Sequence, residues 1–323
     1  MAGALKPIEI GLNAAVVAVE GDVPLILAVK EHGDDKSLGL PFGPFDPVAH
    51  RTLDMGLRAW VEDQTALKLG YVEQLYTFGD RGRHARPGDV GSHAVSVGYL
   101  ALTRVTRESE KAFDRTGAEW CDWYTFFPWE DWREGRPPLL DDVVLPAIER
   151  AVKAAGSSRG GGSFAERMHL AFGDDGTSWD EERVLERYEL LYSAALVIEA
   201  RRDGRRPADK MPALPGTPMR FDHRRILATA ISRLRGKLKY RPVVFELMPP
   251  EFTLTELQRT VEAISGRHLH KQNFRRLVEA NALVERTGET TPRTGGRPAA
   301  LFQFRRDVVR ERQAPGLRVG ARS

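Results

Sequence analysis

The chain has 323 residues, 41% of them hydrophobic and 29% charged, which is typical of a soluble globular protein. This length predicts two or three domains. The single cysteine, Cys121, excludes an internal disulfide, and no apolar run approaches the roughly 20 residues that a membrane helix needs. The N-terminus also lacks a signal-peptide pattern, so we expect a cytoplasmic protein with no membrane partner.

The charge of the chain is divided between its two ends. The net charge at pH 7 is only +3, yet residues 220–310 contain 19 Lys and Arg against 9 Asp and Glu, a net charge of +10. Residues 311–323 add +2, so residues 1–219 carry −9. A strongly basic domain has a natural polyanionic partner, and we expect that partner to be double-stranded DNA.

The N-terminal region begins with a hairpin. Two apolar strands, 12–19 and 24–29, flank the turn residues at 20–22. The Pro- and Gly-rich run at 40–47 excludes a helix or a central strand. After it, apolar residues at helical spacing predict one amphipathic helix over about 51–66.

The following elements complete a mixed α/β pattern. Strands are expected at 71–78 and 93–103, an aromatic-rich segment follows at 120–132, and a helix around 143–155 closes the region. Strands and helices are mixed here without strict alternation. This pattern predicts an α/β sandwich over residues 5–150.

The middle of the chain predicts a helical insertion. Residues 156–163 (GSSRGGGS) have the composition of a flexible linker. Ser178-x-x-Glu181 has the form of a capping box, and the apolar spacing over 184–198 predicts one long helix after it. Nothing in residues 164–219 indicates chemistry, so we expect this connector to serve packing or a dimer contact.

Residues 43–67 resemble a Nudix box, in which a loop and a helix hold Mg²⁺ against a substrate pyrophosphate. Arg58 and the acidic pair at 62–63 match the pattern. His50 and Ala59 stand where the pattern has glutamates, and two adjacent acids on a helix do not point the same way. We therefore predict a Nudix-like domain with no catalytic residues, no metal site and no required cofactor.

A degenerate box is still compatible with a nucleotide pocket between the sheet and the box helix. Loop arginines suit phosphates, and strand aromatics suit stacking on a base. Alternatively, Arg58 and Glu62 form a surface ion pair at i, i+4, the loop arginines are solvated, and the aromatics belong to the core. The expected ligand contacts are Arg58, Glu62, Tyr76, Phe78, Arg81, Arg83 and Arg86.

The basic region shows a helix-turn-helix pattern followed by a hairpin. A helix rich in Arg and Lys begins near Asp222, and Thr253-x-x-Glu256 is a capping box that opens a later helix. A further helix is predicted at about 270–280, and a Gly-rich hairpin follows it. This order predicts a winged helix within residues 220–310, with 311–323 as a flexible tail.

The helix at 270–280 has one apolar side and long donors on the other, as a recognition helix needs. Arg276 suits guanine and Gln272 or Asn273 suits adenine, whereas lysine and arginine on the flanks suit phosphates. Alternatively, the helix is merely basic and solvated. The expected DNA contacts are Lys271, Gln272, Asn273, Arg275 and Arg276, with Arg293 and Arg297 at the hairpin tip for the minor groove.

Several segments resemble the Nudix-related transcriptional regulators of NAD metabolism (the NrtR-like group). They are FDHRRILATAISRLRGKLKY, HKQNFRRLVEANALVE and TGGRPAALFQF in the basic region, and LYTFGD and HAVSVGYLAL in the sensor region. The extra segment 107–219 is similar to the longer, NadQ-type branch. The resemblance implies a homodimeric repressor of NAD biosynthesis genes that senses a nucleotide effector, which is NAD, ADP-ribose or ATP depending on the branch.

An enzyme is the alternative that the sequence leaves open. In this interpretation the Nudix domain is an active nucleotide pyrophosphohydrolase with an ADP-ribose-like substrate, and the basic domain only attaches it to nucleic acid. Turnover of ADP-ribose with Mg²⁺, abolished by Glu62→Gln, would identify the enzyme.

Overall fold

The structure is a computed structural model, and it describes residues 8–30, 37–80, 93–155, 161–173, 178–207, 211–291, 298–307 and 317. A mixed sheet of strand order β3-β2-β1-β6-β5 forms its centre, with β4 paired to β1 and β7 to β2. Only β1 and β6 run parallel among these pairs. The strands are β1 (Ile8–Glu20), β2 (Val23–Lys30), β3 (Leu38–Gly39), β4 (Phe42–Pro44), β5 (Tyr71–Phe78), β6 (His93–Leu102) and β7 (Ala118–Asp122).

The predicted hairpin and the two later strands are confirmed. Gly21 has φ +63°, which permits the tight turn between β1 and β2. Residues 12–18 of β1 are all buried, as expected for a strand covered on both faces. The run at 40–47 contains the short strand β4, which the proline and glycine content did not predict.

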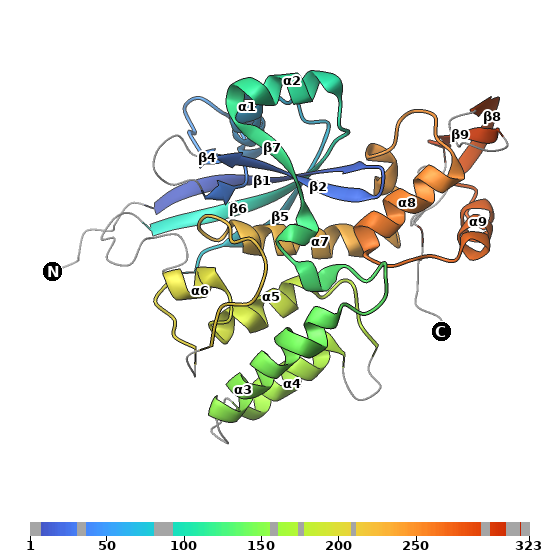
Figure 1. Cartoon of the computed structure of the whole chain (residues 1–323). Coiled ribbons are helices and arrows are strands. Elements are labelled where there is room, and N and C mark those ends of the chain that lie inside the picture. Colours follow the sequence, from blue (N-terminus) through green and yellow to red (C-terminus); the bar gives the residue numbers. More distant parts are fainter. Residues whose placement is uncertain are drawn as a thin grey trace.

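The sheet separates two apolar cores. On one face, α1 (Leu53–Thr65) and α2 (Arg107–Thr116) pack on the strands through Leu57, Val61 and Phe113. On the other face lies α7 (His223–Leu238), and Figure 1 shows the sheet between these helices. α1 confirms the predicted box helix. Thr52 caps its start, and Ala66 ends it with φ +56°, at the place where a Nudix box has glycine.

The insertion differs from its prediction in three places. α3 (Leu145–Ala155) and α4 (Gly161–Phe172) form a projecting pair (Figure 1), so part of the expected linker is helical and 156–160 lie outside the described residues. The capping box at Ser178 does not form, because Asp180 takes the turn and α5 (Val184–Ser193) begins later. The expected long helix also breaks at Ala195, which has φ +54°, before α6 (Ile198–Arg202).

The C-terminal region has the predicted helix, turn, helix and hairpin. α8 (Leu254–Ser265) opens with the Thr253 capping box and ends at Gly266, which has φ +69°. α9 (Lys271–Ala280) follows, and β8 (Val284–Thr291) pairs with β9 (Ala299–Phe304). Leu317, expected in a flexible tail, is buried and donates its backbone N–H to the Leu238 carbonyl, so the tail is attached there.

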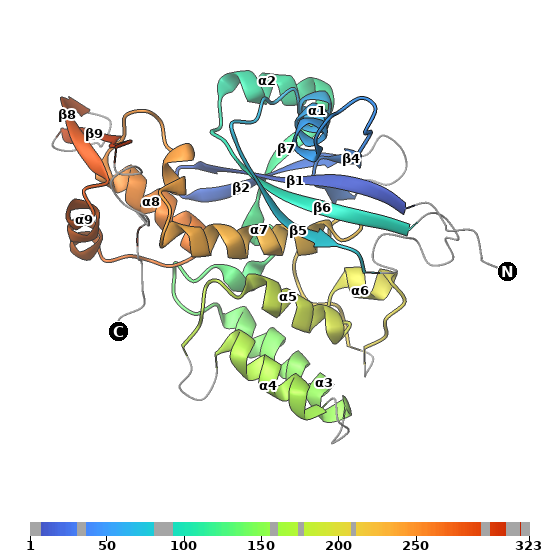
Figure 2. The ribbon, with the colours of Figure 1, turned by 180° about the vertical axis from the view of Figure 1, so that it is seen from behind.

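One apolar core continues from the sheet through α5 and α7 into α8 and α9. α7, expected as the first helix of the DNA-binding module, packs on the sheet, and Figure 2 shows it beside β5 and α5. The domain boundaries at 150 and 220 remain predictions. Within the described residues no helix has the length and apolar character needed to cross a membrane.

Candidate nucleic-acid interface

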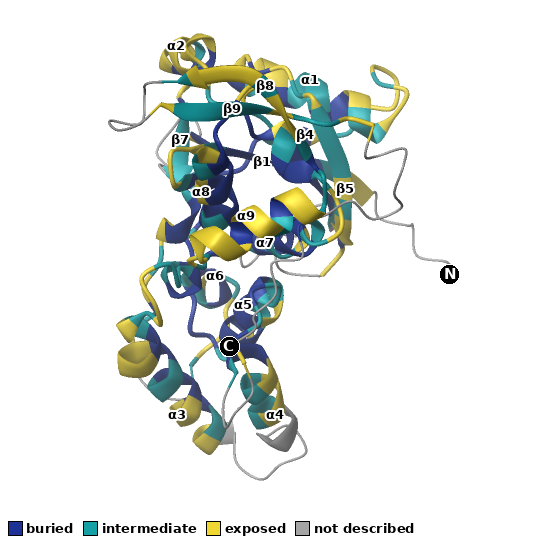
Figure 3. Ribbon diagram, turned by 90° about the vertical axis from the view of Figure 1, so that its right-hand side faces the viewer, coloured by how far each residue is buried: buried dark blue, intermediate teal, exposed yellow. Residues whose placement is uncertain are grey.

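α9 presents one face to its own domain and another to solvent. Phe274 is 2% exposed and Val278 is fully buried, whereas the polar residues opposite them are exposed. In Figure 3 the ribbon of α9 accordingly carries both the buried and the exposed colour. Arg276 donates a hydrogen bond to Asn273, so two of the expected base-reading side chains are held together on this face. The exposed polar residues of α9 are Lys271, Gln272, Asn273, Arg275, Arg276 and Glu279.

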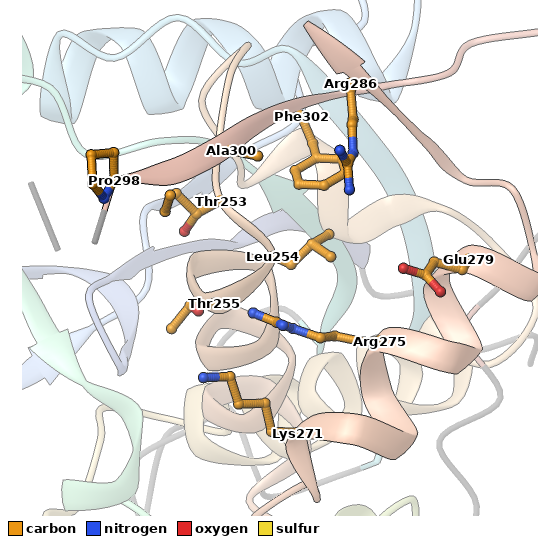
Figure 4. A pocket seen from close by; sticks show the side chains of 11 residues that line it. Thr253, Leu254, Thr255, Lys271, Arg275, Glu279, Arg286, Pro298, Ala300 and Phe302 are labelled. Carbon is orange, nitrogen blue, oxygen red and sulfur yellow. The ribbon is translucent and has the colours of Figure 1, made fainter. Parts of the chain in front are cut away.

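A cavity of about 500 Å³ lies between α9, the first turn of α8 and the β8–β9 hairpin (Figure 4). Lys271, Arg275 and Glu279 line it at i, i+4 and i+8, one above another along α9. Arg286 reaches it from β8, at the opposite wall. Three cations and one carboxylate therefore face a space that is open to a polyanion.

No pattern in the sequence pointed to Arg286 as a lining residue. It lies opposite Phe302 in the hairpin register, and its guanidinium is 5.8 Å from the centre of that ring. The sequence shows that successive side chains of β8 point to opposite faces of the hairpin. It does not show which of the two faces packs toward α9. A backbone bridge between Phe252 and Phe302 fixes this side by joining the hairpin to the residue before the α8 cap.

The hairpin-tip arginines Arg293 and Arg297 lie outside the described residues. So do the loop arginines expected at the nucleotide, Arg81, Arg83 and Arg86. Their roles stay predictions.

Much of the positive charge that the sequence assigned to a DNA face points into the protein. Arg224 and Arg235 of α7 are each 1% exposed and pair with Glu199 and Glu130. Burial lowers the pKa of Lys237, but hydrogen bonds to Glu73 and Tyr71 outweigh it and raise that pKa. The positive charge offered to a partner is therefore smaller than the sequence total suggests; on α9 the exposed cations Lys271, Arg275 and Arg276 outnumber the one exposed carboxylate, Glu279. The α7 and adjoining cations paired with carboxylates are Arg224, Arg225, Arg235, Lys237 and Lys239.

The box residues make contacts that the sequence did not predict. Arg58 pairs with Asp54 at 2.8 Å and donates to the Leu69 carbonyl at 2.6 Å, and it does not pair with Glu62. Glu62 instead lies 3.5 Å from Lys68. Asp54 and Glu62 lie four residues before and after Arg58, so the spacing alone fits an ion pair with either acid. In the structure the loop after α1 places its carbonyl groups around the guanidinium, and Arg58 pairs with Asp54.

The loop before the box is fastened to α1. Gln64 accepts from the Phe42 backbone at 3.0 Å and donates to its carbonyl at 2.6 Å, and Trp60 donates to the Pro44 carbonyl at 2.8 Å. A Cβ on Gly43 would overlap the Trp60 ring. An indole therefore covers the glycine at the start of this box.

Tyr76 and Phe78 face away from the box helix. The register of β5 shifts between Gln74 and Thr77, so that Phe78 lies opposite Ser96, on the side of α7. Strict alternation would have placed both aromatics on the side of α1. They line a second cavity, of about 740 Å³, whose other walls are α7 and the start of α5.

The thiol of Cys121 is protonated at neutral pH. Burial and the neighbouring Glu119 carboxylate raise the pKa of the Cys121 thiol to about 11. Cys121 therefore stays a thiol.

Comparisons with known proteins agree with this geometry. Residues 244–304 match the NrtR DNA-binding winged helix domain family. A curated relative, the ADPR responsive transcriptional repressor NtrR of Acinetobacter baylyi, is 44% identical over 84 residues. That match covers 26% of this chain and a third (33%) of the relative's length.

Solved structures share the fold across nearly the whole chain. Shewanella oneidensis NrtR in complex with a 27mer DNA has a TM-score of 0.55 at 20% identity, covering 93% of this chain and 95% of that one. A MutT/nudix family protein from Enterococcus faecalis has a TM-score of 0.53 at 14% identity, covering 94% and 89%. The expected fold is thus confirmed: residues 244–304 match a winged helix family, and the chain shares its fold with Shewanella oneidensis NrtR and with a MutT/nudix family protein.

Proposed function

We propose that this protein is a transcriptional repressor that binds operator DNA through α9 and the β8–β9 hairpin. The observation that carries the proposal is the cation-lined cavity between α8, α9 and β8, in the region that matches the NrtR DNA-binding domain. α9 would enter the major groove, with Arg276, Gln272 and Asn273 at base edges and Lys271, Arg275 and Arg286 at phosphates.

DNA selection from a random-sequence pool, followed by fluorescence anisotropy, tests this proposal. We expect wild-type protein to enrich one consensus, and Arg276→Ala to weaken binding to it by about 1–3 kcal/mol while relaxing the preference at one position. Arg286→Ala should weaken binding to all DNA sequences by a similar factor. It should also reduce the dependence of the DNA affinity on salt concentration. Arg241→Ala, an exposed arginine away from the cavity, is the control. No enrichment by wild-type protein would refute the proposal.

The sensor half of the proposal concerns a nucleotide. We propose that the Nudix-like domain binds an NAD-related nucleotide without cleaving it, and that the regulated genes serve NAD biosynthesis. The support is a relative named for its response to ADPR, together with a box in which Arg58 is held by Asp54 and Trp60 covers Gly43. NAD and ATP are further candidates for the effector.

Two measurements test the sensor. ADP-ribose should bind the full-length protein in calorimetry and change its DNA affinity, because an effector acts through its different affinities for two states. ADP-ribose should remain unhydrolysed when it is incubated with the protein and Mg²⁺. Turnover that Glu62→Gln abolishes would instead establish the hydrolase.

The proposed repressor acts as a homodimer in the cytoplasm. Two copies of α9 would then read two half-sites separated by one or more helical turns. Light scattering with and without the selected DNA measures the number of chains bound.

A further inference from the structure

We propose that α7 transmits effector binding from the box loop to the winged helix, with His223 as the positioning residue at the start of α7. The box loop is defined as residues 38–44, which contain β3 and β4 and precede the box helix α1. This inference rests on the sensing function proposed above and adds the contacts through which the effector would regulate DNA binding. Figure 2 shows α7 running along the sheet toward α8.

The start of α7 is bonded to the box loop. His223 is 2% exposed, and its Nδ1 accepts the backbone N–H of the fully buried Leu40 at 2.9 Å. The Arg220 backbone N–H donates to the Leu38 carbonyl at 2.8 Å. The Phe42 ring packs edge-on against the His223 imidazole, with 5.0 Å between the ring centres. A displacement of the box loop therefore also displaces the residues that begin α7.

The box loop has no room to shift past His223. A Cβ added to Gly39 would lie 3.0 Å from His223 Nδ1, closer than an ordinary van der Waals contact. On its other side the loop is bonded to the box helix, since Gln64 accepts the Phe42 N–H at 3.0 Å and donates to the Phe42 carbonyl at 2.6 Å. The box helix, the box loop and His223 are thus connected by hydrogen bonds and close packing.

The far end of α7 is bonded to the winged helix. Arg235 is 1% exposed, and its Nε donates to the Ile264 carbonyl in the last turn of α8 at 2.8 Å. One unbroken helix joins His223 to Arg235, a distance of about 18 Å at the helical rise per residue. Rigid helices and hydrogen-bond networks are the structures that carry coupling between distant sites. An effector that favours one placement of the box loop therefore also favours one placement of α8.

Fluorescence anisotropy with the selected DNA, with and without saturating ADP-ribose, NAD or ATP, tests this inference. The measured quantity is the ratio of the two DNA dissociation constants, for which we expect a change of about fivefold to 150-fold in the wild type. His223→Leu removes the acceptor and should bring the ratio to within about twofold of one. His223→Asn should keep most of the wild-type response, because its amide oxygen can replace Nδ1 as the acceptor.

Two further variants separate coupling from stability. Gly39→Ala presses on the same contact from the loop and leaves α7 unchanged, so it should also reduce the response. Arg233→Ala, at an exposed position of the same helix, is the matched control and should respond as wild type does. DNA affinity without nucleotide, and nucleotide affinity without DNA, should stay within about threefold of wild type in all four variants. A change that only destabilised the protein would not alter the ratio alone.

The possible failures are distinguishable. If none of the three nucleotides changes the DNA affinity of the wild type, the sensing function fails and this inference fails with it. If the wild type responds and both His223→Leu and Gly39→Ala respond equally, the role of α7 is refuted while sensing stands. Loss of the response in His223→Asn as well would refute the role of the hydrogen bond to Leu40. If His223→Leu does not fold, an unchanged ratio in Gly39→Ala refutes the inference and a reduced one supports it.

Discussion

Glu130 holds together a fully buried ion cluster, and its loss should strongly destabilise the protein. One of its carboxylate oxygens lies 2.6 Å from Arg187 Nε, and the other lies 2.8 Å from Arg187 Nη2 and 2.9 Å from Arg235 Nη1. Glu130 is 1% exposed, and both guanidinium groups are fully buried. Within the described residues, no other carboxylate lies within ion-pair distance of either arginine.

The change Glu130→Gln keeps the shape and removes the charge. Burial lowers the pKa of Arg235, but Tyr124 and Glu130 outweigh it and raise that pKa, so Arg235 stays charged in the wild type. Two buried cations would then share one amide oxygen, and the amide NH₂ would face guanidinium N–H groups. Removing one member of a buried pair costs about 3–5 kcal/mol, a large part of the ~5–15 kcal/mol that a folded protein has.

Urea unfolding followed by tryptophan fluorescence measures this loss. Glu119→Gln is the matched control, because its partner Lys30 is 51% exposed and such a surface pair contributes only about 0–1 kcal/mol. We expect the midpoint of Glu130→Gln to fall far below those of wild type and of the control. A loss of less than about 1 kcal/mol would show that the two arginines need no buried counter-ion, and would refute the reasoning.

Three further predictions concern two smaller substitutions and the reactivity of the cysteine. Gly43→Ala should destabilise the protein by about 1–3 kcal/mol, because the Trp60 ring must leave the loop; calorimetric melting measures the loss, and an unchanged melting temperature would contradict it. Ala66→Gly should stabilise by about 1 kcal/mol, since Ala66 holds φ +56°; the same scan would show no gain if the strain were absent. Cys121, with a pKa of about 11, should react with a thiol reagent at pH 8 at least about tenfold more slowly than free cysteine, and an equal rate would show that the thiol is not perturbed.

The sequence predicted best the elements that carry local signals. The Thr253 capping box and Gly266 bound α8 as expected, and the apolar spacing of α9 matched its buried side. The turn at Gly21 likewise set the hairpin. These features depend on interactions between residues a few positions apart in the sequence. The local sequence pattern is therefore enough to predict them.

The errors lie where distant segments meet. The bulge in β5 moved Phe78 to the other face of the sheet, and no residue type in that strand announces it. The arginines of α7 gave a high local charge, but Glu130 and Glu199, far away in sequence, neutralise Arg235 and Arg224. Summed charge therefore overstated the positive surface that this region offers to a partner.

The end of α8 is fastened to the body of the protein at several points. Arg235 donates to the Ile264 carbonyl at 2.8 Å, Tyr124 donates to the Ala263 carbonyl at 2.8 Å, and the Trp132 backbone donates to Gly266 at 2.8 Å. A fragment cut out at residues 244–304 would lose all three partners and uncover the apolar side of α8 that packs on α7. The winged helix of this chain is thus not a portable module, and grafting it onto another protein would require α7 and the 124–132 segment as well.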